Sequence, residues 1–455
     1  MLEVITIIIL LIVALIAYLI NRSIDQNIMD FDSAVEKTRT RNVKEKQGSA
    51  LSCLMGYSGK RKIEIPINGN HVYICGTTGT GKTVAIANFI ECGVNNDFPM
   101  LIIDGKGDKN NGSMLDIIQQ LKKDKKFYIV DMNSPEESDK YNPFCNTSPT
   151  VIKDMLVNLT DWTEPHYKLN TERYLQRVIA LLDNAELPLS IKSIVEHMSI
   201  DSFTKLSGQL QKQDVLSKEE HLHNITLAKE SGNIAQGAIA RFSTILEGEV
   251  GEIFSDDGID IYTALQEKAI ILFILNPLEY PELSTLFGKL IVIDSKKAVA
   301  KIYGNHLGKV LFIMDEINVY ASTSLLDLVN KSRSGDVTCV LASQSLSDLE
   351  ASTDAGVSFK EQVIENCNNY LVLRQNSATN AEMWANIIGT RPSMAVTYQL
   401  GTKDHVTSST GAGTAKLVRE YYYHPDDIKA LAKGRAYYIN KDANTRTKVA
   451  IKKPF

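Results

Sequence analysis

The sequence predicts an α/β protein in which a mostly parallel sheet is interrupted by an inserted all-helical domain and preceded by an N-terminal transmembrane helix. Short apolar runs alternate with helical patterns over residues 61–146, vanish over 147–255 and return over 256–455. Such alternation is typical of parallel α/β sheets. The chain is 44% hydrophobic and 23% charged, which excludes disorder or a coiled coil as a description of the whole.

The first element is an apolar segment at the N-terminus. Val4–Ile20 is uncharged, and only Thr6 and Tyr18 in it carry polar groups. At about 1.5 Å per residue such a segment is just long enough to cross a bilayer. A cleaved signal peptide is the alternative, but the start Met-Leu-Glu lacks its basic region. Basic residues follow the segment, so we expect a single-pass anchor over 1–22 in the cell inner or plasma membrane, with the bulk in the cytoplasm.

The next elements follow in order along the chain. Residues 23–60 are polar and of mixed charge, and we expect a juxtamembrane linker there. Residues 61–146 and 256–455 are expected to form one nucleotide-binding domain, because pieces of one phosphate site are divided between them. Helical apolar spacing within 147–255 predicts the inserted all-helical domain. Further strands are predicted at Ala269–Leu275, Val310–Met314, Thr338–Ala342, Tyr370–Leu373 and Ala436–Ile439.

Charge and cysteine content limit the classes of function. The formal net charge is −5, so a chain-wide basic surface for nucleic acid is excluded and any DNA contact must come from local loops. The six cysteines are scattered without a C-x-x-C pair. We therefore expect reduced core thiols in preference to disulfides or a zinc site.

A phosphate-binding loop follows the predicted strand His71–Cys75. The segment Gly76-Thr-Thr-Gly-Thr-Gly-Lys82-Thr83 matches G-x-x-x-x-G-K-[ST], and a helical pattern follows it. Backbone N–H groups of such a loop surround phosphates, which distinguishes it from a plain glycine-rich turn. We expect Lys82 to reach the β- and γ-phosphates of ATP and Thr83 to hold Mg²⁺. The predicted nucleotide-binding residues are Gly76, Thr77, Thr78, Gly79, Thr80, Gly81, Lys82 and Thr83.

The predicted strand Val310–Met314 ends in Asp315-Glu316. Asp315 is placed to hold Mg²⁺, and Glu316 suits the general base that polarises an attacking water. An acidic turn at a strand end is the alternative. The pair favours a hydrolysing ATPase over most kinases.

Two more polar residues complete the predicted site. Gln344 follows the predicted strand Thr338–Ala342 and is placed to sense the γ-phosphate, although an amide that caps the next helix would look the same. Arg333 precedes that strand, at a position from which an arginine reaches the γ-phosphate of a neighbouring subunit. Arg374, after the Tyr370–Leu373 strand, is the rival for that role.

The order of these motifs resembles the FtsK/HerA-like branch of RecA-fold motor ATPases, and more closely the type IV coupling proteins of conjugation and type IV secretion. The resemblance is carried by the motifs already described and by three more, Asp104-Gly-Lys-Gly-Asp108, Tyr141-Asn-Pro-Phe144, and the C-terminal Asp426-Asp427-Ile followed by Gly434-Arg-Ala-Tyr-Tyr-Ile439. It covers about residues 60–145 and 262–445.

This resemblance implies a RecA-like core and a homohexameric ring that uses ATP and Mg²⁺ to move DNA. The implied partners are DNA, a relaxase or other secretion cargo, inner-membrane components of type IV secretion, and the membrane. Such proteins usually have two membrane helices, whereas this chain offers one. The alternative function is an ATP-dependent receptor for polypeptide cargo without a DNA step, and a third is a scaffold with a silent nucleotide site.

Overall fold

The computed structural model describes residues 51–159, 162, 164–305, 307–351, 359–403 and 406–454, with side chains described outside 396–415. The expected membrane anchor, 1–22, and most of the expected linker lie outside the described residues. Among the residues described, no helix combines the length and apolarity needed to cross a membrane.

The core is one large mixed sheet with the strand order β2-β1-β13-β12-β9-β3-β8-β7-β4-β6-β5. Strands from β9 to β5 in that order run parallel, and the four at the other end run antiparallel. The predicted α/β class with a mostly parallel sheet is therefore confirmed. The strands are β1 (Ser52–Ser58), β2 (Arg61–Pro66), β3 (His71–Cys75), β4 (Met100–Asp104), β5 (Phe127–Asp131), β6 (Ile270–Ile274), β7 (Val310–Asp315), β8 (Val337–Ser343), β9 (Cys367–Val372), β12 (Arg435–Asn440) and β13 (Thr445–Ile451), with β10 (Thr390–Lys403) and β11 (Val406–Tyr421) in a separate hairpin.

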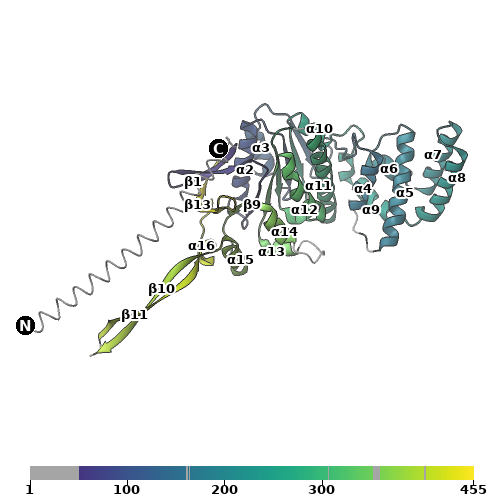
Figure 1. The fold of residues 1–455 in the computed structure, drawn as a ribbon. Helices are drawn as coiled ribbons and strands as arrows, with labels where there is room; N and C mark the ends of the chain where they lie inside the picture. Colours follow the sequence, from purple (N-terminus) through teal and green to yellow (C-terminus); the bar gives the residue numbers. More distant parts are fainter. Residues whose placement is uncertain are drawn as a thin grey trace, which may run out of the picture. The chain divides into compact units, whose positions relative to one another are not determined.

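Helices cover both faces of this sheet (Figure 1). On one face α2 and α3 bury residues with one set of strand side chains, and on the other α11 and α12 pack against the opposite set. The helices are α2 (Lys82–Asn95), α3 (Met114–Leu121), α4 (Pro149–Leu159), α5 (Pro165–Asn184), α6 (Ile191–His197), α7 (Ile200–Lys212), α8 (Lys218–Leu227), α9 (Gln236–Leu246), α10 (Ile261–Gln266), α11 (Pro281–Gly304), α12 (Thr323–Ser332), α13 (Leu346–Ala351), α14 (Phe359–Asn366), α15 (Ala378–Ile388) and α16 (Pro425–Lys429).

Burial on both faces explains the composition of the central strands. Every residue of β3, β4, β6, β7 and β8 is buried. Their sequences are accordingly near-continuous apolar runs, as expected for parallel strands between two helical layers. The polar residues that do occur in them lie mainly at strand ends, where the carboxyl edge of the sheet carries the candidate site.

Between β5 and β6 the described chain forms helices from Pro149 to Ile253. Serine side chains at the N-caps of α6, α7 and α8 accept backbone N–H bonds, which fixes where these helices begin. The buried stripe of α5 includes Tyr174, Leu175, Val178 and Leu182, at the spacing of one helical face. Both helical segments expected here, at 174–183 and 189–198, lie on helices α5 and α6.

Tyr141 joins the chain entering these helices to α11. Its hydroxyl donates a hydrogen bond of 2.8 Å to Asp294 Oδ2. Asp294 Oδ1 lies 2.8 Å from Lys297 Nζ, which also donates to the Pro143 carbonyl at 2.6 Å. Tyr141 and Asp294 are fully buried, and Lys297 is nearly so. A buried ion pair on α11 therefore holds the segment that leads out of the sheet.

Two expectations about residues 51–92 are wrong. The range expected to be linker includes β1, which pairs with β2 and β13 in the main sheet. Cys53 of β1 and Cys92 of α2 form a disulfide, with their Cα atoms 5.5 Å apart, although reduced thiols were expected. The disulfide forms because tertiary packing places β1 beside α2, a contact that the local sequence does not predict. The other four cysteines are free thiols.

The hairpin β10–β11 was not predicted. Its strands pair only with each other in the described structure, and cross-strand pairs run from Thr390 with Tyr421 to Lys403 with Val406. Threonine, serine and glycine are frequent in these strands, and such residues give little of the apolar alternation that identifies a strand in sequence.

Candidate active site

The predicted phosphate loop lies between β3 and α2, which begins at Lys82. Gly79 and Gly81 have φ of 76° and 114°, in the left-handed region that favours glycine. The Gly76 N–H donates to the Ser343 carbonyl at 3.3 Å, and the Thr77 N–H donates to the Arg374 carbonyl at 3.1 Å. The loop is thus fixed by the ends of both strands that flank β3.

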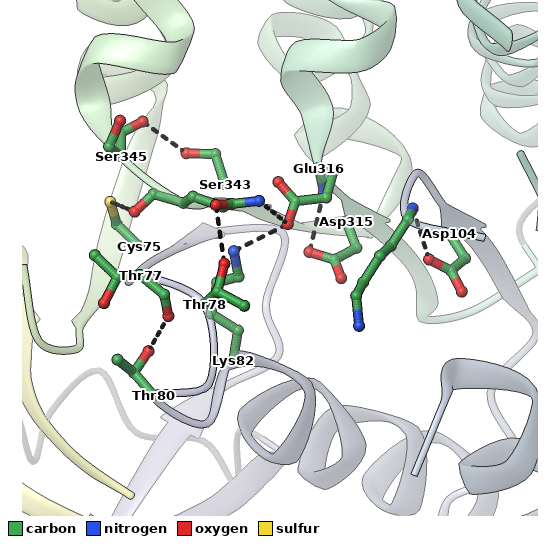
Figure 2. Close-up of polar contacts among 12 residues, drawn as sticks. Cys75, Thr77, Thr78, Thr80, Lys82, Asp104, Asp315, Glu316, Ser343 and Ser345 are labelled. Carbon is green, nitrogen blue, oxygen red and sulfur yellow. Dashed lines mark hydrogen bonds and ion pairs between the residues drawn. The ribbon is translucent and has the colours of Figure 1, made fainter. Parts of the chain in front are cut away.

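Lys82 and Glu316 point toward each other beside this loop (Figure 2), and the side chain of Gln344 joins them. Lys82 Nζ lies 3.0 Å from Glu316 Oε1. The Gln344 side-chain amide donates to the same oxygen at 3.2 Å, and Gln344 Oε1 accepts a hydrogen bond from Thr78 Oγ1 at 3.1 Å. β3, β8 and β7 are neighbours in the sheet, so their carboxyl ends bring these residues together. The result is a carboxylate held by an ammonium group and an amide.

The backbone at Glu316 is in an uncommon conformation. Its φ and ψ are 48° and 52°, in the left-handed region. A Cβ at Gly105 would lie 2.8 Å from the Asp315 carbonyl oxygen and 3.0 Å from Glu316 Cβ. The close approach of residue 105 therefore requires glycine and confines the turn that carries Glu316. Such strained positions cluster at functional sites.

Two carboxylates lie side by side at the ends of β7 and β4. Asp104 is the register partner of Asp315, and both are buried. Burial, together with the nearby Glu316 charge, raises the pKa of Asp315 to about 7. Burial raises the pKa of Asp104 to about 6. In the sequence Asp104 is identified only as part of the Asp104–Asp108 motif; its position beside Asp315 depends on the strand order, which the sequence alone does not reveal.

These oxygens suit Mg²⁺ that arrives with a nucleotide. Within the described ranges no group of three or more His, Cys, Asp or Glu side chains could hold a metal by itself. Mg²⁺ is commonly held by one or two carboxylates together with substrate phosphates. Thr83, the second residue of α2, and Asp315, the last residue of β7, would provide a hydroxyl and a carboxylate for such an ion. A cation there would offset the burial of the acidic pair.

The two arginines predicted for the site, Arg333 and Arg374, lie at opposite ends of the parallel strands. Arg333 precedes β8 and packs against the turn before β3, where a Cβ at Gly69 would lie 3.0 Å from its carbonyl oxygen. β8 has 7 residues, so this amino end lies about 20 Å from the carboxyl edge. Arg374 follows β9 and touches the phosphate loop through its carbonyl. The structure therefore brings Arg374, and not Arg333, to the loop of the same chain.

Comparison with known proteins points to one group. Residues 309–433 match the family described as the TraM recognition site of TraD and TraG, a range that includes Asp315, Glu316, Arg333 and Gln344. The predicted resemblance to coupling proteins is thereby confirmed. No protein of curated function matches the sequence.

Solved structures share the fold. The bacterial conjugative coupling protein TrwBdeltaN70, in an unbound form, is 15% identical with a TM-score of 0.65, and the match covers 90% of both chains. TrwB in complex with ADP and Mg²⁺ is 16% identical with a TM-score of 0.61, covering 90% of this chain and 96% of that one. VirB4 of Thermoanaerobacter pseudethanolicus is 11% identical with a TM-score of 0.53, covering 90% of this chain and 97% of the other.

Proposed function

We propose that this chain is a membrane-anchored ATPase that couples ATP hydrolysis to the movement of DNA, or of a relaxase–DNA conjugate, in conjugative transfer through type IV secretion. The observation that carries the proposal is the convergence of Lys82 and Gln344 on Glu316 at the carboxyl edge of the sheet. The match of residues 309–433 to TraD and TraG supports the conjugative setting.

In the proposed mechanism each residue of the site has a role. Backbone N–H groups of Gly76–Thr83 bind the phosphates, and Lys82 moves from Glu316 to the β- and γ-phosphates when ATP binds. Glu316 then accepts a proton from a water whose oxygen attacks the γ-phosphorus, while the bond to the β–γ bridging oxygen breaks. Gln344 orients that water. Thr83 and Asp315 would hold Mg²⁺, which supplies positive charge against the phosphate oxygens.

The wider assembly follows from the same proposal. Residues 1–22 anchor the protein in the cell inner or plasma membrane, and the ATPase core works in the cytoplasm as a homohexamer. Arg333, exposed and distant from its own phosphate loop, acts on the ATP of a neighbouring subunit. Residues 309–433 would meet partners of the conjugation machinery, since they match a recognition site of that kind.

The test is ATP turnover by the purified full chain in detergent, with and without single- or double-stranded DNA. We expect DNA to stimulate turnover. Glu316→Gln should retain ATP binding and lose turnover at least about 100-fold, because the general base is removed. Lys82→Ala should lose both. Glu382→Gln, an exposed glutamate on α15, is the matched control and should behave as the unmodified chain.

Two outcomes would contradict the proposal. Unchanged hydrolysis in Glu316→Gln would remove this residue from the chemistry. A rate of ATP turnover that neither form of DNA changes, but that a secreted protein raises, would indicate a receptor for polypeptide cargo.

A further inference from the structure

The segment after β9 is attached directly to the phosphate loop. β9 runs parallel to β3 with Val372 beside Cys75, and the Leu373 N–H donates to the Cys75 carbonyl at 2.8 Å. One residue later, the Arg374 carbonyl accepts from both the N–H and the hydroxyl of Thr77, at 3.1 and 3.2 Å. The main chain of Arg374 is therefore fixed against the loop that is expected to bind phosphates.

No carboxylate among the described residues pairs with the side chain of Arg374. Its Nε is buried and has no hydrogen-bond partner, and the described part of the chain contains no ion pair to its guanidinium. An arginine stays protonated in proteins, and a buried donor of a charged group is costly when unpaired. Lys82, the other cation at the loop, is paired with Glu316. An anion bound at the loop, to which the Arg374 main chain is fixed, would give this donor a partner.

Strand order places this arginine on the side away from the hydrolytic residues. β3 lies between β9, which leads to Arg374, and β8, which leads to Gln344; Glu316 lies one strand further. The turn before β12 also contacts the phosphate loop, because the Gly434 N–H donates to the Thr80 carbonyl at 2.9 Å. A nucleotide in the loop would meet Glu316 on one flank and Arg374 on the other.

We propose that Arg374 binds the phosphates of the nucleotide held by its own phosphate loop, from the flank opposite Glu316. This inference rests on the proposed function and deepens it. The guanidinium fork matches two phosphate oxygens. Because the residue is distant from the water that Glu316 activates, it contributes equally to ATP and ADP binding. It lowers KM and leaves kcat nearly unchanged, as uniform binding does. The role is in cis, unlike that of an arginine acting from a neighbouring subunit.

The test is the Kd of a fluorescent ADP for the full chain in detergent. Arg374→Ala should weaken binding about 10- to 100-fold, the loss expected for a hydrogen bond to a charged group, and Arg374→Lys should restore part of it. Arg173→Ala, at an exposed arginine on α5, is the matched control and should leave the Kd of ADP unchanged. Circular dichroism and urea midpoints equal to those of the unmodified chain establish that the variants fold.

A second measurement separates cis from trans action. Subunits carrying Lys82→Ala are mixed with subunits carrying Arg374→Ala, and turnover is measured at low ATP. A residue acting in cis predicts no recovery, whereas recovery would overturn the inference.

The outcomes also separate this inference from the function on which it rests. ADP binding that requires Lys82 but not Arg374 overturns the inference alone. An unmodified chain that binds no nucleotide overturns both. Loss of kcat in Arg374→Ala with an unchanged Kd would refute the inferred role in nucleotide binding and favour an action on the reacting phosphate.

Discussion

The buried ion pair on α11 gives a quantitative test of how the helical part is attached. Asp294 receives hydrogen-bonding or ionic contact from Tyr141 and Lys297, and Lys297 also reaches the Pro143 carbonyl. Burial raises the pKa of Asp294, and the Lys297 charge opposes that rise. The charged form of each group is thus stabilised by the other, because Asp294 is fully buried and Lys297 is nearly so.

Asp294→Asn keeps the shape and removes the negative charge. Lys297, whose side chain is 5% exposed, is then left buried without a counter-charge. Breaking one partner of a buried pair costs about 3–5 kcal/mol of unfolding free energy. Replacing both partners, as Asp294→Asn with Lys297→Met, removes the uncompensated charge and should recover most of that loss. The adjacent pair Lys296–Asp327 is 32% and 44% exposed, so the control Lys296→Met should cost at most about 1 kcal/mol.

The assay is urea unfolding of the full chain followed by tryptophan fluorescence. The chain has two tryptophans. Trp384 is buried beside Tyr73 in the sheet core, and Trp162 lies in the helical part, where its indole N–H donates to Val157. Variants that retain one tryptophan report each part separately. We expect the larger loss at Trp162, because Tyr141 leads into the helices. An Asp294→Asn variant within 1 kcal/mol of the control, or a double variant no better than the single, would refute this reasoning.

Three further predictions concern other parts of the molecule. Burial lowers the pKa of His71 to about 4, below the unfolded value of about 6.5. The contribution of neutral His71 to the free energy of unfolding is therefore present above pH 6.5, and that free energy should fall by about 2 kcal/mol by pH 5. His71→Gln should abolish this fall, as measured by urea titrations at each pH. Reducing the Cys53–Cys92 disulfide, which spans 39 residues, should cost up to about 4 kcal/mol by the chain-entropy model; an unchanged melting temperature on addition of dithiothreitol would speak against the bridge. Gln344→Ala should lower kcat about 10- to 100-fold with little change in ATP affinity, because the amide contacts the side chains of Glu316 and Thr78 and leaves the backbone N–H groups of the phosphate loop in place; equal loss of affinity would contradict this.

The sequence was sufficient to predict which residues come together where these residues lie at the ends of strands. Lys82, Glu316 and Gln344 each follow a strand with a clear apolar pattern, and parallel strands present their carboxyl ends at one edge of the sheet. Their convergence could therefore be predicted without knowing the strand order. The register of Asp104 with Asp315 could not, because β4 and β7 are separated by the whole helical part and become neighbours only in the folded sheet.

Contacts that join distant elements were not predictable for the same reason. The disulfide requires β1 beside α2, and Arg374 reaches the loop only because β9 pairs with β3. The local sequence around Cys53, Cys92 and Arg374 is compatible with many other placements. In each case the information lies in the order of strands within the sheet.

The charge balance at the carboxyl edge explains why the site has its particular form. Asp104, Asp315 and Glu316 lie close together, and Lys82 contacts only the last of them. Burial of the first two disfavours their charged forms, as their raised pKa values indicate. A core selected for stability alone would replace such groups with apolar residues. These buried acidic groups therefore lower the stability of the fold until additional positive charge neutralises them. A ligand that brings positive charge would supply it, so the stability of this region depends on the ligand that it binds.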